Sequence, residues 1–442
     1  MAERALHPSA LPAISVVIPS YGRGELLVET LRRCRACAGP VSLELVVIDD
    51  GSRDDTPQRL ATLAEEMPEL VWRSVPNGGP GAARNLGASL AKHEIVLFLG
   101  DDMQPENDGF FLAHAELHGR HPSRGFAVVG KVIWPNRPDS PVNFVMAHVQ
   151  GRGGQQFGYA DLDPYSFLDW RFFYTANVSV KRTIVDDWQT EGFSSAFTRY
   201  GYEDGEFAYR MMKQREPMRL LYAPTAIVSH HHPLDADAFL SRQLSAGMMA
   251  RVFLDLHADP ELPELLGVAR VQQALGRPVE VAEGILAADL LAMVEGVKSW
   301  VRVADRMQRL GSQWWHDDLL RGAFALCYQQ GFVFASSSPG ANVGAACWLM
   351  LDDFARAMQR AVQVEIAGSA LGRWDLSGLF QLAVPAPVLE GVPSGRPRSE
   401  RLRRLFVGGP ERLPRLREWV KARPRLAAAF RRLRRRLTGV GA

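Results

Sequence analysis

Acidic residues stand in pairs at three points of the sequence where an apolar run ends or a helix is expected to begin. The pairs are residues 49–50 in "VVIDDGS", 101–102 in "FLGDDM" and 203–204 in "YEDGE", and three histidines follow at 230–232 in "SHHHP". Two adjacent carboxylates at the end of a buried strand repel each other and lose hydration, so a cation is expected to offset both costs. Carboxylate and imidazole ligands suit Mn²⁺ or Mg²⁺, and the scarcity of thiolates argues against structural zinc.

The first 100 residues alternate between short apolar runs and segments with helical periodicity. Strands are expected at 13–21, 43–52, 70–76 and 94–102, with helices at 24–37, 53–67 and 80–93 between them. This alternation predicts right-handed βαβ units and a parallel sheet. Ligands of such sheets bind beyond the carboxyl ends of the strands, where the acidic pairs fall.

The pattern loosens after residue 130. Segments 135–141 and 150–166 are rich in Gly, Pro and Gln and predict long surface loops, followed by a strand at 172–182, a helix at 203–214 and a strand at 219–233. From about residue 239 the chain is rich in Ala and Leu and predicts helices. We therefore expect a first domain at 1–238, a helical domain at 239–385, and a linker with a basic tail at 386–442.

Composition sets the class of protein. The chain has 442 residues, 47% hydrophobic and 23% charged, which predicts a folded protein of more than one domain. The first 13 residues lack an apolar stretch and predict no cleavable signal, while 322–351 is too interrupted to be a membrane span. Four cysteines cannot make a disulfide framework. Cys34 and Cys37 form a lone CxxC, read as two helix thiols or, alternatively, as a zinc or redox pair.

Charge is distributed unevenly along the chain. Residues 396–436 hold 16 Arg and Lys against 3 Asp and Glu, a net charge of +13. Because the whole chain carries +2, the remainder carries −11. A basic tail on an acidic body predicts attachment to an anionic membrane surface, against the alternative of a solvated helical tail. Nucleic acid is disfavoured because the tail has few interleaved aromatic residues. The expected location is the cytoplasm, peripheral to the inner face of the cell membrane.

Seven short motifs occur in an order that resembles the family-2 glycosyltransferases of GT-A fold. They are "VVIPSYGR", "VVIDDGSRDDT", "NGGPGAARNLG", "IVLFLGDDMQP", "TANVSVKR", "EGFSSAF" and "YEDGEFAYRM", and they span about residues 12–235. The resemblance implies an α/β fold, a Rossmann-like, mostly parallel sheet flanked by helices, followed here by a helical C-terminal region. It also implies inverting transfer of a sugar from a nucleotide donor, with a UDP-sugar expected, to a glycan or glycolipid acceptor.

The resemblance also assigns residues to the donor and the metal. Asp50 corresponds to the carboxylate that contacts the nucleoside base, Asp101 to the ribose-side carboxylate and Asp102 to the metal ligand. His230 corresponds to a further ligand of Mn²⁺ or Mg²⁺, with His232 as the fallback. Gly100 departs from the family pattern, which usually has an acidic residue there, and this weakens the ribose assignment. The remaining donor-binding positions are Pro19, Tyr21 and Arg84.

On the acceptor side, Asp204 corresponds to the general base and Glu203 to a residue that orients the acceptor or the base. Asn177 corresponds to the floor of the acceptor side, and Trp170 is read either as core or as an acceptor-stacking residue. Taken singly, the acidic pairs are also what helix starts favour. Two rival functions stay open: a catalytically silent sugar- or nucleotide-binding module, which needs no base, and a nucleotidyltransferase, which would lack the "YEDGE" helix.

Overall fold

The computed structural model describes residues 11–368, apart from 137, 139–140, 152–155, 187–191, 278–294, 300, 303–316 and 339–340. Contacts divide the chain into one unit at 1–351 and a second at 352–442. The expected linker and basic tail at 386–442 lie outside the described residues. The sheet and the candidate site described below belong to the first unit.

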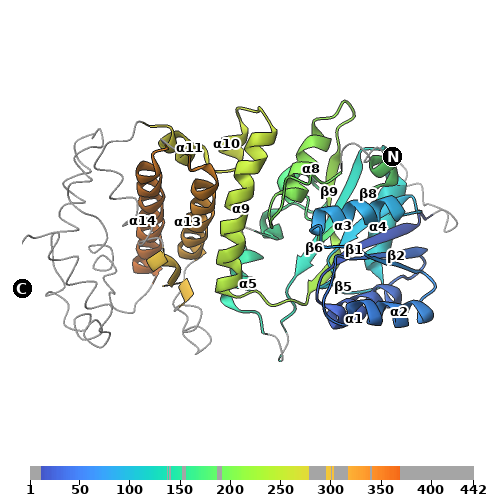
Figure 1. Ribbon diagram of the computed structural model, residues 1–442. Helices are drawn as coiled ribbons and strands as arrows, with labels where there is room; N and C mark the ends of the chain where they lie inside the picture. Colours follow the sequence, from blue (N-terminus) through green and yellow to red (C-terminus); the bar gives the residue numbers. More distant parts are fainter. Residues whose placement is uncertain are drawn as a thin grey trace, which may run out of the picture. The chain divides into compact units, whose positions relative to one another are not determined.

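A nine-stranded mixed sheet forms the core of the first unit (Figure 1). Its strand order is β3-β2-β1-β4-β8-β6-β9-β5, and β7 pairs with β9. The strands β3, β2, β1 and β4 run parallel, whereas β8 is antiparallel to both β4 and β6. The strands are β1 (Ile14–Ser20), β2 (Leu43–Asp49), β3 (Leu70–Ser74), β4 (Ile95–Leu99), β5 (Met103–Pro105), β6 (Phe126–Ile133), β7 (Phe167–Leu168), β8 (Asn177–Lys181) and β9 (Arg219–His230).

Helices cover both faces of the parallel half. The right-handed crossovers place α1 and α2 on one face, and the return from β3 past β2 and β1 to β4 places α3 on the other (Figure 1). α4 covers the face of β8 that carries Asn177 and Ser179. The expected α/β fold with flanking helices is confirmed. The helices that precede α9 in the described part of the chain are α1 (Gly24–Ala36), α2 (Thr56–Glu66), α3 (Pro80–Leu90), α4 (Gly109–Arg120), α5 (Phe144–Val149), α6 (Arg182–Asp186) and α8 (Glu203–Met212).

Two expectations from composition are wrong in detail. Part of the expected surface loop at 150–166 is core, because Phe157 and Tyr159 are 2% and 4% exposed and pack with Trp134 and Tyr174. The strand expected at 172–182 is shorter, since the chain forms a 3₁₀ turn, η3 (Trp170–Phe172), and β8 begins only at Asn177. The Gly- and Gln-rich composition of 150–166 predicted a surface loop because composition carries no information about contacts with distant residues. The burial of the aromatic side chains decides the position of the segment instead.

A helical region follows the sheet, as expected, with α9 (Ala236–Leu256), α10 (Leu262–Leu265), α11 (Ala269–Leu275), α13 (Asp317–Ser336) and α14 (Val343–Gly368). α9 and α13 approach closely where Gly247 meets Tyr328 and Gly331 meets Leu244. Only glycine fits at these two positions, because a Cβ atom on either residue would overlap a backbone carbonyl oxygen of the other helix. Among the described residues, no helix is both long and apolar enough to cross a membrane.

The expected boundary at 238/239 is not a break in packing. Ser245 of α9 donates a hydrogen bond to the Tyr200 carbonyl at 2.7 Å, just before α8. Phe253 of α9 is fully buried and lies edge-on to Trp170 and Tyr209. The beginning of the helical region is therefore part of the same core as the sheet, and the contact-based division falls later, inside α14.

Candidate active site

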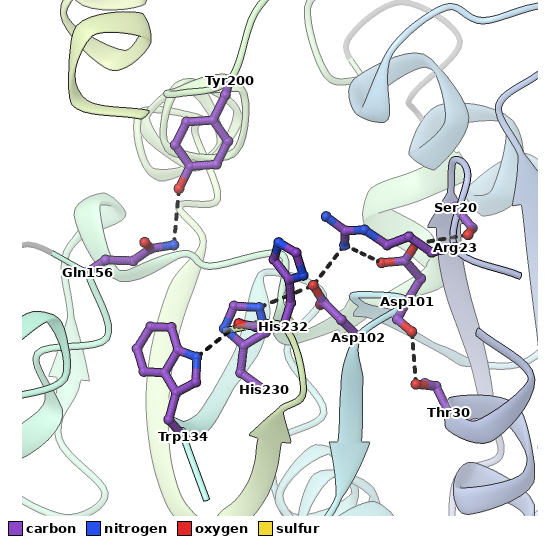
Figure 2. Close-up of polar contacts among 10 residues, drawn as sticks. All are labelled: Ser20, Arg23, Thr30, Asp101, Asp102, Trp134, Gln156, Tyr200, His230 and His232. Atoms are coloured by element: carbon purple, nitrogen blue, oxygen red, sulfur yellow. Dashed lines mark hydrogen bonds and ion pairs between the residues drawn. The ribbon is translucent and has the colours of Figure 1, made fainter. Parts of the chain in front are cut away.

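Asp101 and Asp102 follow β4 after one intervening residue, Gly100, and are 7% and 6% exposed. Asp101 accepts a hydrogen bond from the Ser20 hydroxyl at 2.8 Å, and its backbone carbonyl accepts one from Thr30. One guanidinium nitrogen of Arg23, Nη1, contacts Asp101 Oδ1 at 3.0 Å and Asp102 Oδ2 at 2.8 Å (Figure 2). The two carboxylates thus converge on one positive charge at the carboxyl end of the parallel strands.

The two carboxyl groups differ in their affinity for protons. Burial, and then the charge of Asp102, raise the pKa of Asp101 to about 6. Burial also acts to raise the pKa of Asp102, but His230 and Arg23 outweigh it and hold that pKa below its usual range. Asp102 is therefore the more acidic carboxyl group of the pair, and a metal ligand must be ionised.

His230 is the last residue of β9, and strand pairing brings it to Asp102. Met103 of β5 pairs with His230, and the His231 amide donates to the Asp102 carbonyl at 2.8 Å. His230 Nε2 lies 3.1 Å from Asp102 Oδ2 in a buried contact, and the Trp134 ring packs on the imidazole with 4.9 Å between centroids. His232 is half-buried, with its ring centroid 6.3 Å from that of His230. The structure favours His230 over His232 as the partner of Asp102.

The donor set fits a divalent cation bound with few protein ligands. Within the described residues, no three His, Cys, Asp or Glu side chains are grouped so as to hold an ion, so Asp102 and His230 are a pair rather than part of a triad. Two neighbouring ligands of one octahedral ion at 2.1 Å are about 3 Å apart, close to the separation of their facing atoms. Mg²⁺ and Mn²⁺ commonly take one or two protein ligands and complete their shell with substrate phosphates and water. His230 Nδ1 has no hydrogen-bond partner.

Asp204 lies in the first turn of α8, beside β8. Its Oδ2 accepts hydrogen bonds from the Thr175 amide at 3.3 Å and, weakly, from the Thr175 hydroxyl at 3.5 Å. Burial, and then the charge of Glu203, raise the pKa of Asp204 to about 6. Tyr202 enters the helix with φ 67°, a left-handed conformation that is strained for a residue with a Cβ. A half-buried carboxyl with a pKa near neutrality is suited to general-base chemistry.

Glu203, the neighbour of Asp204 at the start of α8, is held by contacts of its own. It forms an ion pair with Arg84 of α3 at 3.3 Å, and its other oxygen accepts a hydrogen bond from the Gly201 amide at 3.2 Å. Arg84 also lies over the Phe193 ring, 5.7 Å from its centroid. The ion pair therefore fixes the start of α8 to α3. Arg84 acts on the site through its contact with Glu203.

Backbone contacts join the Asp102 and Asp204 halves of the site. The Gly100 amide donates to the Ala176 carbonyl at 3.4 Å, and Leu99 pairs with Asn177. Gly100 precedes the acidic pair directly, and Ala176 follows Thr175 directly, so the hydrogen-bond partner of Asp204 lies next to the end of β4. Two residues that are a hundred positions apart in the sequence share one edge of the sheet.

The expected nucleoside-side residues lie along the ends of β1 and β2. Asp50 is 4% exposed, and its two oxygens accept from the Gly78 amide at 2.7 Å and the Gly79 amide at 2.9 Å. Pro19 is in β1, and Tyr21, just beyond it, is 50% exposed. Asp50 thus fixes the loop before α3, while Tyr21 offers an open ring at the same edge. Their contacts with a nucleoside stay predictions.

Two residues expected on the acceptor side are buried. Asn177 is fully buried, and its amide group donates to the Ala226 carbonyl at 3.0 Å and the Lys131 carbonyl at 3.3 Å. Trp170 is 7% exposed and packs against Tyr209 and Phe253. Asn177 can therefore support the floor of the site only from beneath, and the core reading of Trp170 fits its position better than acceptor stacking.

Several residues near the site gave little signal in the sequence. Arg23 ends the motif "VVIPSYGR", just beyond the first expected strand, and Thr175 opens "TANVSV". Tyr200 is 44% exposed and receives a 3.0 Å hydrogen bond from Gln156, opposite Trp134 and His230 (Figure 2). The Arg242 guanidinium of α9 lies over the Tyr200 ring, 5.4 Å from its centroid. Strand ends could have suggested Arg23 and Thr175, but only tertiary packing reveals the others.

Comparisons with known proteins agree with this architecture. Residues 15–151 match the family model described as Glycosyl transferase family 2. Validoxylamine A glucosyltransferase of Streptomyces hygroscopicus subsp. limoneus is 29% identical over 241 residues, covering 50% of this chain and 53% of that protein. Undecaprenyl-phosphate 4-deoxy-4-formamido-L-arabinose transferase of Pseudomonas fluorescens (strain Pf0-1) is 35% identical over 141 residues, covering 30% and 39%. The chain thus spans about half the length, or less, of the curated relatives it matches.

Solved structures also resemble the chain at a distance. S. aureus TarS 1–349 has a TM-score of 0.42 and 16% identity, covering 80% of this chain and 92% of that one. The mannosyltransferase PcManGT from Pyrobaculum calidifontis, solved with GDP-Man and Mn²⁺, has a TM-score of 0.40 and 17% identity, covering 80% and 90%. The family resemblance inferred from the seven motifs is confirmed for residues 15–151, which match the model of glycosyl transferase family 2.

Proposed function

We propose that the protein transfers a sugar, with inversion, from a nucleoside-diphosphate donor to a hydroxyl acceptor in a metal-dependent reaction. The observation that carries the proposal is that a candidate cation site and a candidate general base lie at the same edge of the sheet. Asp102 and His230 offer a cation site at the ends of β4 and β9. Asp204, a carboxyl group with a raised pKa, is bound to Thr175 beside that edge.

The chain's own residues account for proton transfer. Asp204 takes the proton of the acceptor hydroxyl as that oxygen attacks the anomeric carbon and the bond to the diphosphate breaks. Thr175 holds the Asp204 carboxyl in place, and the ion pair between Glu203 and Arg84 fixes the first turn of α8. A bound Mn²⁺ or Mg²⁺, held by Asp102 and His230, would supply positive charge to the leaving diphosphate. A single displacement of this kind inverts the anomeric configuration.

The substrates are inferred at the level of class. A UDP-sugar is the expected donor, and the relatives are named for validoxylamine A in one case and for undecaprenyl phosphate in the other. We therefore propose a hydroxylated acceptor in glycan, glycolipid or related small-molecule synthesis. An acceptor panel should contain both a soluble and a polyprenyl-linked class.

The proposal is tested by incubating the protein with a panel of nucleotide sugars and Mn²⁺, and measuring release of nucleoside diphosphate with and without acceptors. We expect release with one donor, dependence on Mn²⁺ and an increase with the correct acceptor. Binding of a nucleotide sugar without turnover by any acceptor would favour a silent binding module. Release of inorganic diphosphate from a nucleoside triphosphate and a sugar phosphate would favour a nucleotidyltransferase.

We further propose that the basic segment 396–436, net charge +13, attaches the protein to anionic lipid. Truncation after Val392 should release the protein from anionic vesicles in co-sedimentation and leave activity on a soluble acceptor intact. High salt should have the same effect, because the attraction is screened over about 8 Å at physiological ionic strength. Equal pelleting of the full-length and truncated proteins would reduce the tail to a solvated appendage.

A further inference from the structure

Arg23 lies at the point where β1 turns into α1. Gly22, with φ 66°, turns the chain, and its amide donates to the Ser52 hydroxyl at 2.8 Å. This turn directs the Arg23 side chain to the end of β4 rather than to solvent (Figure 2). There its Nη1 atom contacts both Asp101 Oδ1 and Asp102 Oδ2.

The position of Nη1 is one that a metal ion would also favour. Asp102 Oδ2, which Arg23 contacts at 2.8 Å, is the same oxygen that faces His230 Nε2 at 3.1 Å. The side chains of Asp101 and Asp102 are each 9% exposed, so water screens their mutual repulsion poorly. When no metal ion is bound, another positive charge is therefore needed at this point to offset the repulsion between the two carboxylates.

We propose that Arg23 is a built-in counter-ion of the metal-free protein, and that a divalent cation displaces its guanidinium from Asp102. The inference deepens the proposed function and rests on its metal site. It makes Arg23 a positioning residue, which holds the two carboxylates in place before the metal and the donor arrive. The displaced side chain can move, since it is 35% exposed.

Arginine suits this role because its charge cannot be removed. A lysine at this point could lose its proton and stay in place when a metal binds, but a guanidinium keeps its charge at any physiological pH. Arg23 and the metal ion therefore compete for Asp102 directly. The competition lowers the apparent metal affinity of the free protein, and it stabilises the protein when no metal is present.

The test is the Mn²⁺ affinity of the full-length protein, measured by electron paramagnetic resonance with UDP present, in wild type and in Arg23→Gln. A unit charge 4 Å away changes a binding constant by roughly fivefold even in bulk water, and by more near a protein surface. We expect Arg23→Gln to bind Mn²⁺ about tenfold more tightly. Without metal its melting temperature should fall, and Mn²⁺ should raise it by more than in wild type.

Arg251→Gln is the matched control. Arg251 of α9 is 33% exposed and pairs with Asp255 in its own helix, so it resembles Arg23 in exposure and in having an acidic partner. It should bind Mn²⁺ as wild type does, and its melting temperature should respond to Mn²⁺ as in wild type. Arg23→Lys, which keeps a positive charge, should lie between wild type and Arg23→Gln in metal affinity.

Two results separate the failure of this inference from that of the proposed function. Equal or weaker Mn²⁺ binding by Arg23→Gln, with wild type binding normally, overturns the counter-ion role and leaves the metal site standing. Absence of Mn²⁺ binding in both proteins overturns the inference together with the metal dependence of the reaction. Metal-free release of nucleoside diphosphate would then show that the transfer itself survives.

Discussion

Two buried polar clusters lie on neighbouring strands of the same sheet and differ in their electrostatics. The first, the charged edge, consists of Arg23, Asp101, Asp102 and His230 at the end of β4. The second, the neutral network, consists of His114, His118, Asn177 and Ser179 between α4 and β8. Leu99, at the end of β4, pairs with Asn177, so only a few residues separate them.

The neutral network forms a chain of hydrogen bonds with one consistent direction. Asn177 Oδ1 can only accept, so His114 Nε2, 3.1 Å away, carries the proton. His114 Nδ1 then accepts from the Ser179 hydroxyl at 2.8 Å, and Ser179 accepts from His118 Nε2 at 2.8 Å. Every member is fully buried, and burial lowers the pKa of His114 to about 4. Because His114 Nδ1 accepts a hydrogen bond, the His114 imidazole must be neutral in this network, while His118 Nδ1 is buried without a partner among the described residues.

The charged edge has no such directional chain of hydrogen bonds. Its carboxylates converge on one guanidinium nitrogen, and Arg23 stays one-third exposed. Hydrogen bonds between neutral buried groups contribute stability and specify one packing, whereas converging like charges form a site to which a cation can bind. The comparison predicts that changes at the charged edge affect binding and turnover, and that changes in the neutral network affect folding.

The largest expected effect is on the charged edge. Asp102→Ala should abolish metal-dependent binding of a nucleoside diphosphate, because the cation would join that carboxylate to the diphosphate. Calorimetric titration of UDP with and without Mn²⁺ measures this. If the mutant kept the Mn²⁺ dependence of wild type, the carboxylate pair after β4 would not be part of the site.

Asp204→Asn should leave donor binding nearly intact and lower turnover by roughly 10²–10⁴-fold, the usual contribution of a positioned general base. Steady-state kinetics at saturating donor and acceptor measure turnover, and calorimetry measures donor affinity. A collapse of donor affinity with surviving turnover would make Asp204 a binding residue. Glu203 would then be the better candidate for the base.

The neutral network should make the fold sensitive to acid. Because the pKa of His114 is lower in the folded protein than its ordinary value of 6.5, the unfolded chain takes up a proton that the folded protein refuses. The contribution is fully present above pH 6.5 and is lost as pH falls toward 4, by about 3 kcal/mol. Denaturant unfolding at stepped pH measures it. His114→Gln should show a shallower loss, and equal slopes would contradict the assignment.

Ser179→Ala removes the hydroxyl that links the two imidazoles and leaves His118 Nε2 and His114 Nδ1 without their partner. The cost of such orphaned buried groups is about 2 kcal/mol in the free energy of unfolding. Chemical denaturation at pH 8 checks the value, and Mn²⁺ affinity should stay that of wild type. A loss of metal binding without a loss of stability would show that the two clusters are not separate in function.

The smallest expected effect is the loss of activity on the acid side of the pH profile. Burial and Glu203 raise the pKa of Asp204 to about 6, and the base must be ionised to accept a proton. The value of kcat/KM should therefore fall below pH 6, by about tenfold at pH 5. A pH profile between 5 and 8 measures it, at pH values where unfolding has been excluded. In Glu203→Gln this loss should move to lower pH, because a negative charge next to Asp204 is gone.

The sequence by itself determined the parallel half of the sheet and the positions of the acidic pairs. Short apolar strands alternate with helices of fixed length, and the ends of such strands share one edge. It also identified Asp102, Asp204 and His230 as a set through the order of the motifs. These are local patterns, and local patterns depend on residue type and spacing alone.

Only the tertiary structure decided which charges face each other. It placed Arg23 on the carboxylate pair, and it brought His230, which the sequence had already put ahead of His232, to 3.1 Å from Asp102. It also buried Asn177, which the resemblance had placed on the acceptor side, and the aromatic residues Phe157 and Tyr159, which composition had placed in a surface loop. Such pairings join residues tens to more than a hundred positions apart. Their energies depend on burial and on distances of a few ångströms, which exist only once the sheet has assembled.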